Sequence, residues 1–462
     1  MNKQKVVIIG AVAAGAKAAA KLKRLRPDWD VEVYTQDEHV SYAACGMPYF
    51  IKGTFDDVNR LFARSVEDFE RQGINIHTGH KCIKLLPDIK SVVIKNLQNG
   101  QESVVSYGKL ILATGAKPFL PPIKNLNYKN IYTLRNVSDA IAIKEKMHNS
   151  KSVTIIGGGY IAIEMLEAFV HNGLKATVIT DSMHLMNFYD LDIAKLIQEN
   201  VLEISKGQAD IITSDPVVAI EGENEYASKT ITMKGVEVES DFILLCAGIY
   251  PNSELAIEAG LETGVKNSIR VDSRMRTSNE HIYAAGDCCE KTGYVSKTKW
   301  YIGLGSIANK EGRVAAINAA GYEENFSGIL LSAVTKYFDF NIAKVGLTEV
   351  MALERGYEIL SAKVTKRDRA GYMPDVADIT LKMIADAKTG KILGAQAVGY
   401  GDAEKRICIV AAAIQGNLGI EDFLNLDLPY APPFSSVVDV LHICCMQLKD
   451  KITTFNKNMT NE

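Results

Sequence analysis

Two segments of this chain repeat one order of elements: a short β-branched strand, a glycine-containing turn and an apolar helix. The first is KVVIIGAVAAGAKAAAKLKRL at 5–25, followed by a second strand, VEVY, at 31–34. The other is SVTIIGGGYIAIEMLEAFVHNGLKATVIT at 152–180, which carries its own second strand. A strand that enters a helix through a glycine turn opens a βαβ unit, and such units build parallel sheets. The sequence therefore predicts two nucleotide-binding units.

The glycine turns are predicted pyrophosphate sites. A turn from strand into helix leaves backbone N–H groups free and concentrates positive partial charge. Gly157, Gly159 and Ala162 match the GxGxxG/A pattern in this context. The first turn keeps Gly10 and Gly15 at its ends but has valine at the middle glycine position, so by itself it is also consistent with a plain tight turn.

The residue that ends the second strand of each unit bears on which nucleotide binds, because an acidic residue there accepts hydrogen bonds from the adenosine ribose. In the second unit Asp181 follows the strand with no lysine or arginine beside it, which favours NADH over NADPH. In the first unit Thr35 stands at this place, with Asp37 and Glu38 just beyond, so that ribose contact stays open.

The rest of the chain predicts an α/β protein with two Rossmann-like domains and a C-terminal α+β domain suited to pairing two chains. Strands end in glycine at 107–118, 241–252 and 281–290, and a helix is expected from about 305 to 320. Beyond 330 the pattern changes to long strands with a helix around 403–415. The predicted domains are 1–117 and 246–325 for the first nucleotide, 118–245 for the second, and 326–462 for dimerisation.

The composition of the chain argues against some classes of binding partner. A net charge of −3 gives no basic field for nucleic acid or an anionic membrane, and no apolar run reaches the length of a membrane span. The eight cysteines are scattered without paired CxxC motifs, and the histidines show no metal-ligand spacing. We therefore expect a cytoplasmic protein without a metal site.

One cysteine stands out by its surroundings, SYAACGMPYF at 41–50. Gly46 allows a ligand to approach the backbone and Pro48 fixes the chain direction after Cys45. A lone cysteine is, however, more often an inert core residue than a reagent. The residues alone leave both interpretations of Cys45 open.

Taken together, Cys45, LILATGAKP at 110–118, GGGYIAIE at 157–164 and IYAAGD at 282–287 make the chain resemble the pyridine nucleotide–disulfide oxidoreductases over nearly its whole length. The resemblance implies FAD in the first unit, NAD(P)H in the second and a homodimer. It implies that Asp287 binds the ribityl chain and that Tyr160 covers the flavin as a lid, although Tyr160 also fits an ordinary helix start. The cofactor-binding residues that we predict are Gly10, Ala13, Gly15, Thr114, Gly115, Asp287, Gly157, Gly159, Tyr160, Glu164 and Asp181.

Within this family the chain is similar to the single-cysteine branch, because no CxxxxC spacing follows Cys45. SYAACGMPYF and LPYAPPFSS at 428–436 resemble the coenzyme A-disulfide reductases, a group that includes persulfide and polysulfide reductases. Oxidases and peroxidases of this branch place a histidine where Ala13 stands. The chain departs from the group at Ala44, usually asparagine, and at Met373, usually a second tyrosine.

The resemblance implies that the Cys45 thiolate attacks a disulfide and forms a mixed disulfide, so we expect its pKa to be lowered by nearby N–H groups or by the flavin. Tyr430, reaching the site from the partner subunit, is the predicted proton donor, with Tyr372 as the second candidate. Substrate contacts are predicted for Lys21, Arg24, Ser41 and Arg64, the cations meeting coenzyme A phosphates, although a solvated helix face explains the spacing of Lys21 and Arg24 as well.

Two other functions stay open: an NADH oxidase that works through a cysteine sulfenic acid, and a flavin-binding redox sensor. The adjacent pairs Cys288–Cys289 and Cys444–Cys445 are interpreted as structural, since neighbouring cysteines bridge poorly. A redox or metal role is the alternative for the second pair. We expect no sulfur-transfer module fused after the core.

Overall fold

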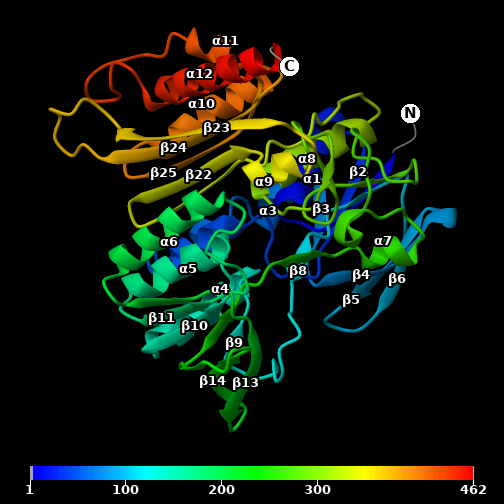
Figure 1. The fold of residues 1–462 in the computed structure, drawn as a ribbon. Helices are drawn as coiled ribbons and strands as arrows, with labels where there is room; N and C mark the ends of the chain where they lie inside the picture. The colour runs from blue at the N-terminus through cyan, green and yellow to red at the C-terminus, as the bar shows by residue number, and fades with distance from the viewer. Residues whose placement is uncertain (1–3, 461–462) are drawn as a thin grey trace.

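The computed structural model describes residues 4–460 and arranges them around three five-stranded sheets (Figure 1). The first sheet is entirely parallel, in the order β18-β7-β1-β2-β3. Its central strands are apolar on both faces, as a sheet covered on both sides requires. The strands are β1 (Lys5–Ile9), β2 (Asp30–Tyr34), β3 (Ile74–His77), β7 (Lys109–Leu112) and β18 (Ile282–Ala284).

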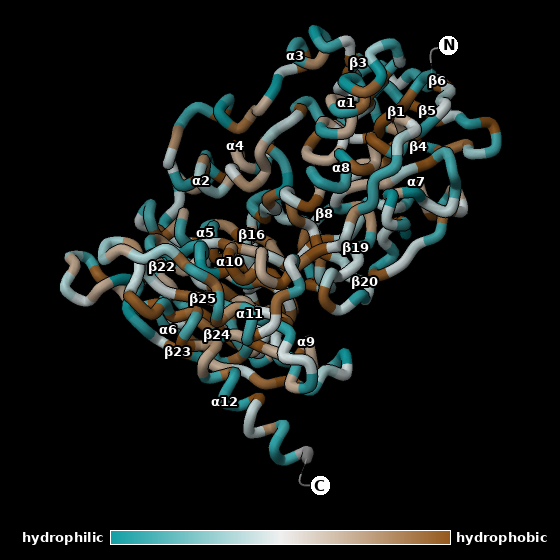
Figure 2. Tube along the Cα trace, turned by 90° about the horizontal axis from the view of Figure 1, so that it is seen from above, coloured by the Kyte–Doolittle hydropathy of each residue, from teal (hydrophilic) through white to brown (hydrophobic). Residues whose placement is uncertain are grey.

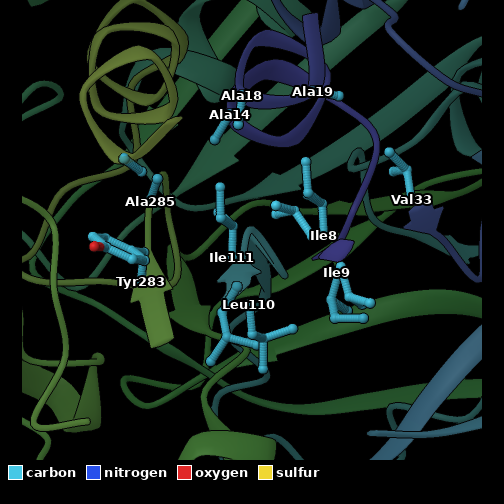
Figure 3. Packing of buried hydrophobic residues seen from close by; sticks show 14 of the residues in the cluster. Ile8, Ile9, Ala14, Ala18, Ala19, Val33, Leu110, Ile111, Tyr283 and Ala285 are labelled. Atoms are coloured by element: carbon cyan, nitrogen blue, oxygen red, sulfur yellow. The ribbon is translucent and has the colours of Figure 1, made fainter. Parts of the chain in front are cut away.

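Helices α1 (Ala13–Leu25) and α8 (Gly305–Ala319) lie side by side over this sheet (Figures 1 and 3). In Figure 3 Ile8 and Ile111 point toward α1, whereas Ile9 and Leu110 point to the opposite face. The two helices approach closely because small residues face each other: a Cβ added to Gly312 would lie 2.2 Å from the carbonyl oxygen of Ala14.

A small antiparallel sheet and several short elements complete this unit. They are α2 (Met47–Lys52), α3 (Val66–Glu70), β4 (His80–Leu86), β5 (Ser91–Asn96), β6 (Glu102–Ser106), α7 (Glu254–Glu258), β19 (Lys291–Thr292) and β20 (Lys299–Trp300). The chain leaves the unit through β8 (Ala116–Pro118) and returns through β17 (Ile249–Pro251), and these two strands pair antiparallel.

The second sheet repeats the parallel arrangement in the order β12-β11-β10-β16-β9. Its strands are β9 (Ile131–Tyr132), β10 (Ser152–Ile156), β11 (Lys175–Ile179), β12 (Ala209–Ile212) and β16 (Ile243–Leu245). Its helices are α4 (Val137–His148), α5 (Tyr160–His171) and α6 (Leu191–Ser205), and a three-stranded appendage comprises β13 (Val217–Glu223), β14 (Tyr226–Thr232) and β15 (Glu237–Glu239).

The third sheet is antiparallel, in the order β21-β22-β25-β24-β23. Helices α10 and α12 pack against its strands, and Figure 2 shows the C-terminal end of α12 standing clear of the body. The elements are β21 (Ala333–Tyr337), β22 (Phe340–Gly346), α9 (Glu349–Leu353), β23 (Ile359–Arg367), β24 (Asp378–Asp386), β25 (Ile392–Gly399), α10 (Ala403–Gln415), α11 (Ile420–Leu424) and α12 (Val440–Thr460).

The predicted fold class is confirmed, with two parallel sheets and a C-terminal α+β unit. The helix expected at 305–320 runs from Gly305 to Ala319, and that expected at 403–415 has those bounds. The domain boundaries at 117, 245 and 325 stay predictions. Among the described residues, no helix combines the length and the apolar character needed to cross a bilayer.

Replacing Gly312 by alanine is expected to destabilise the fold by about 2 kcal/mol, because the new methyl group overlaps the backbone of α1. Urea unfolding measures the loss. The matched control is Gly371→Ala, at a site with open space around the added methyl group and no left-handed backbone, which should leave the unfolding midpoint unchanged. Equal midpoints for Gly312→Ala and the parent would contradict the close packing of α1 on α8.

Candidate active site

Cys45 lies in a single helical turn, Ala44–Gly46, that leads directly into α2. Met47, Phe50 and Ile51 of α2 are buried in the core of the second nucleotide unit, not the first. Lys52, at the end of α2, forms an ion pair of 2.5 Å with Glu167 of α5. Helix α2 therefore holds Cys45 at the junction of the two units.

The Cys45 side chain is exposed, and residues of both predicted cofactor motifs surround it. Glu164 of the second glycine motif and Asp287 of the IYAAGD motif are near enough to act on its charge. A Cβ added to Gly305, the first residue of α8, would lie 3.9 Å from its Sγ. Cys45 is thus no core residue, and the positive end of α8 faces its sulfur.

The protein groups around Cys45 together raise its pKa, so the local N–H groups alone do not lower it, and the expected effect of the flavin stays a prediction. Burial contributes most, and the carboxylates of Glu164 and Asp287 add to it. The backbone N–H of Cys45 and the Arg135 guanidinium act in the opposite direction but are outweighed. Desolvation and, after it, the charges of two nearby carboxyl groups disfavour the thiolate, which is why the N–H contribution is outweighed.

The first glycine turn has the form of a ligand cradle. Gly10 has φ +106°, and a Cβ there would lie 2.1 Å from the carbonyl oxygen of Ala113. Gly15 is as tightly placed, since its Cβ would lie 1.8 Å from the Gly10 carbonyl oxygen. Ala13 begins α1, and no side chain caps the N-terminal N–H groups of that helix. These groups remain available to a pyrophosphate.

Asp287 faces a cluster drawn from three segments. Its Oδ2 accepts a hydrogen bond of 3.1 Å from Arg135 Nη2. Gly115 has φ +71°, and a Cβ there would lie 3.2 Å from the same nitrogen. Thr114 Oγ1 donates to the Asn252 carbonyl oxygen at 2.6 Å, and the Asn252 amide donates back to the Thr114 carbonyl oxygen at 2.9 Å. The predicted residues Thr114, Gly115 and Asp287 therefore come together.

This part of the chain fits FAD. The two cradle glycines leave no room for side chains, and the Tyr301 hydroxyl near Asp287 is buried without a hydrogen-bond partner among the described residues. Sequence reasoning missed Arg135, Asn252 and Tyr301. Asn252 ends the segment 241–252 already singled out as a strand ending in glycine, whereas no local pattern marks Arg135 or Tyr301.

The second glycine turn is equally constrained. Gly157 has φ +123°, and a Cβ there would lie 2.5 Å from the carbonyl oxygen of Cys246. Gly159 caps α5, and Tyr160 is its first helical residue. The Tyr160 ring packs on Phe188 with centroids 4.7 Å apart, and its hydroxyl lies 3.4 Å from that of Tyr189. Tyr160 therefore belongs to an aromatic cluster at the N-terminus of α5.

Glu164 lies one helical turn after Tyr160, largely buried. Burial raises the pKa of Glu164 from 4.5 to about 7, against the effect of a hydrogen bond of 3.1 Å from Thr335 Oγ1. At the end of β11 the exposed Asp181 accepts hydrogen bonds from Ser182 and Thr180 hydroxyls, at 3.1 and 3.4 Å.

The predicted substrate cations lie on the first unit. Lys21 and Arg24 belong to α1, and Arg64 stacks over the Phe69 ring at 5.5 Å. Within residues 4–460 none of these three cations forms an ion pair with a carboxylate. Ser41 has φ +51° and connects the regions: its N–H donates to the Ala11 carbonyl oxygen at 2.8 Å, and its carbonyl oxygen accepts from Ala63 at 2.9 Å.

The two predicted proton donors are neighbours on the third unit. Tyr372 is 77% exposed and Tyr430 44% exposed, and a hydrogen bond between them contributes, after partial burial, to raising the pKa of Tyr430. The backbone N–H of Ala370 donates to the Pro432 carbonyl oxygen at 3.3 Å, which joins their two loops. In the described part of the chain no hydrogen bond connects either tyrosine to Cys45 or its neighbours.

Both vicinal cysteine pairs are buried, and all eight cysteines are free thiols. Cys444 Sγ donates to the Ala362 carbonyl oxygen at 3.1 Å, and Cys445 Sγ lies 3.8 Å from the sulfur of Met383. No group of three or more potential metal ligands occurs among the described residues. Both thiols of the C-terminal pair are packed in the core of the third unit, and their structural role stays a prediction.

Comparison with known proteins identifies the family. Residues 4–320 match the family model described as pyridine nucleotide-disulphide oxidoreductase, and residues 332–441 match its dimerisation domain. The chain belongs to the pyridine nucleotide-disulphide oxidoreductase family. The predicted family and its cofactors, FAD and NAD(P)H, are thereby confirmed, and the C-terminal sheet is a dimerisation domain.

Three similar proteins span nearly the whole chain. The NAD(P)H coenzyme A polysulfide/persulfide reductase of Pyrococcus horikoshii is 36% identical over 450 residues, 97% of this chain and 99% of that one. An NADH oxidase of Methanocaldococcus jannaschii is 31% identical and covers 97% of this chain and 99% of its own. The structure of an NAD-dependent persulfide reductase from A. fulgidus superposes with a TM-score of 0.93 at 34% identity, covering 97% and 83%.

Replacing Glu164 by glutamine is expected to change the pH dependence of stability. The folded protein keeps the proton of the Glu164 carboxyl group up to about pH 7, whereas the unfolded chain releases it near pH 4.5. Folding stability therefore falls as the pH rises between these values. Glu164→Gln should raise the free energy of unfolding by about 2 kcal/mol at pH 8 and leave it nearly unchanged at pH 5.

Urea unfolding at both pH values measures the difference. The exposed Glu145→Gln serves as the control and should have no effect at either pH. A Glu164→Gln variant that is no more stable than the parent at pH 8 would mean that the Glu164 carboxyl ionises as an ordinary surface group.

Proposed function

We propose that this enzyme uses NAD(P)H and FAD to reduce coenzyme A disulfide or a related small disulfide, persulfide or polysulfide through Cys45. The observation that carries the proposal is the place of Cys45, exposed between the Asp287 and Glu164 motifs. A thiol at this junction is accessible to a substrate and adjacent to both cofactor motifs. The relatives from Pyrococcus horikoshii and A. fulgidus are named as reductases of such sulfur compounds.

A single sulfur suffices for this chemistry because the substrate supplies the other one. Five of the remaining cysteines are buried, and in the described chain none forms a disulfide with Cys45. The Cys45 thiolate attacks one sulfur of R–S–S–R, which forms the Cys45–S–S–R bond and expels R–S⁻. The expelled thiolate carries away the electron pair of the broken bond.

Tyr430 is the proposed acid for this leaving group. A phenol carries its proton at neutral pH and donates it to R–S⁻ where the two groups meet in hydrogen-bond contact. Its exposure on the dimerisation domain, without a hydrogen bond to Cys45 among the described residues, supports a role in the partner's site. Bound FAD supplies the two electrons, taken from NAD(P)H as hydride, that cleave the mixed disulfide.

The remaining residues orient substrate and nucleotide. Lys21, Arg24 and Arg64 form no ion pair with a carboxylate of the described chain, and each is a candidate to bind the phosphates of a coenzyme A moiety. The backbone N–H of Ser41 donates to the carbonyl oxygen of Ala11 in the first glycine turn, so Ser41 lies beside that turn. At the second turn the exposed carboxylate of Asp181 suits a ribose hydroxyl and repels a 2′-phosphate, which favours NADH.

An NADH oxidase is the second candidate, favoured by the 31% identical relative from Methanocaldococcus jannaschii. A sulfenic acid at Cys45 needs a hydrogen-bonding partner during its formation and reduction. Ala13, at the start of α1, offers only a methyl group. This makes the reductase the better supported function, and both are favoured over a redox sensor because the chain carries the motifs of a flavin and of a nicotinamide site.

Cys45→Ser is expected to abolish disulfide reduction, with a loss of at least about 10³-fold, because serine is a far weaker nucleophile toward sulfur. Reduction of bound flavin by NADH should remain. Anaerobic NADH consumption is followed with coenzyme A disulfide, glutathione disulfide, cystine and polysulfide in parallel. If none of these accelerates the parent enzyme while oxygen does, the oxidase is the correct function.

Tyr430→Phe is expected to lower kcat by about 10²-fold through loss of the acid, and Tyr372→Phe by less. Co-expression of Cys45→Ser with Tyr430→Phe chains tests the subunit arrangement. A mixed dimer regains one complete site only if Tyr430 serves the partner's Cys45. Mixed dimers no more active than the Tyr430→Phe homodimer would place the two residues in the same chain's site.

A further inference from the structure

A buried ion pair lies directly beneath the Asp287 turn. Lys291 Nζ is 3.0 Å from Glu311 Oε2, and the two side chains are 1% and 0% exposed. Lys291 follows the turn in β19, whereas Glu311 comes from the middle of α8. None of the proposed chemical steps uses either residue, yet both are ionisable groups in the core of the first unit.

Lys291 and Glu311 form hydrogen bonds with both backbone polar groups of Gly286, the residue that precedes Asp287. Glu311 Oε2 accepts the Gly286 N–H at 2.9 Å, and Lys291 Nζ donates to the Gly286 carbonyl oxygen at 2.6 Å. Lys291 also donates to the carbonyl oxygen of Cys289 at 2.9 Å. The orientation of the peptide groups on either side of Gly286 is therefore set by two charged side chains.

The backbone of Gly286 has little room to adopt another conformation. Its φ is +86°, and a Cβ there would lie 3.0 Å from the Cβ of Ala14 in α1 and 3.5 Å from that of Ala308 in α8. The turn is thus inserted between the two helices whose first residues face the proposed flavin and Cys45. A tilt of the Gly286 peptides would move the carboxylate of Asp287 relative to Arg135.

A gain in folding stability does not explain why the Lys291–Glu311 ion pair is buried. Burying two charges costs several kcal/mol for each ion, and buried pairs exchanged for neutral residues of similar volume often leave stability unchanged or higher. Glu311 Oε1 is buried without a hydrogen-bond partner among the described residues, a further cost. What the charges provide is strong, directed hydrogen bonds to one peptide unit.

We propose that Lys291 and Glu311 are positioning residues for FAD: their ion pair fixes the Gly286–Asp287 turn in the orientation that binds the cofactor. Neither residue touches the reacting atoms. Cys289, whose Sγ lies 3.4 Å from Lys291 Nζ and 3.2 Å from the Gly286 carbonyl oxygen, is held in the same group as a packed thiol.

The deciding variant is the double substitution Lys291→Met with Glu311→Gln. It removes both charges together, so no unpaired ion is left in the core, and the glutamine still accepts the Gly286 N–H. The hydrogen bonds that Lys291 donates to the carbonyl oxygens of Gly286 and Cys289 are lost. We expect the purified holoenzyme to bind FAD about three- to tenfold more weakly than the parent, while the unfolding midpoint in excess FAD stays within about 2 °C.

FAD release on serial dilution, followed by the fluorescence of free flavin, gives the dissociation constant, and circular dichroism gives the midpoint. No disulfide substrate is involved, so the result is separate from the proposed reaction. The matched control is Arg313→Met with Glu324→Gln, which removes the ion pair between Arg313 of the same helix and Glu324 beyond its end and should retain FAD as the parent does. Unchanged FAD affinity in the Lys291/Glu311 double variant, or weakened affinity in the control to the same degree, overturns the proposal.

Discussion

The arrangement of the active site depends on the packing of α2 into the second nucleotide unit. Met47, Phe50 and Ile51 are buried beside α5, and the Lys52–Glu167 ion pair closes the contact at the end of the helix. Because α2 is only one and a half turns long, its position fixes that of the residue just before it. Cys45 is therefore held between the units by burial elsewhere, and its own side chain remains free for a substrate.

The parts of the fold predicted from sequence are those whose cause is local. Gly10 and Gly157 adopt positive φ and lie against a neighbouring backbone, which only glycine tolerates. The strand–glycine–helix pattern therefore predicts the turn that each of them forms. Long helices such as α1, α8 and α10 follow from apolar periodicity. Helix α2 escaped prediction because six residues, MPYFIK, are too few to show a helical period.

The parts that escaped prediction arise from groups far apart in the chain. Arg135 precedes the capped start of α4, yet its guanidinium meets Asp287, 152 residues later. Lys291 and Glu311 likewise meet only because β19 and α8 converge under one turn. The pKa of Cys45 sums burial with the charges of Glu164, Asp287 and Arg135, which come from three segments, so no pattern around the cysteine reveals its direction.

That direction bears on the chemistry proposed for Cys45. Burial and, after it, the charges of Glu164 and Asp287 raise the pKa of the thiol, so a smaller fraction of it is thiolate at neutral pH. The N-terminus of α8, which lies near the sulfur, offsets this only in part because it carries a partial charge. In the described part of the chain, Tyr372 and Tyr430 of the dimerisation domain form no hydrogen bond with Cys45 of their own chain. This fits the proposed site, in which Tyr430 serves the partner's Cys45.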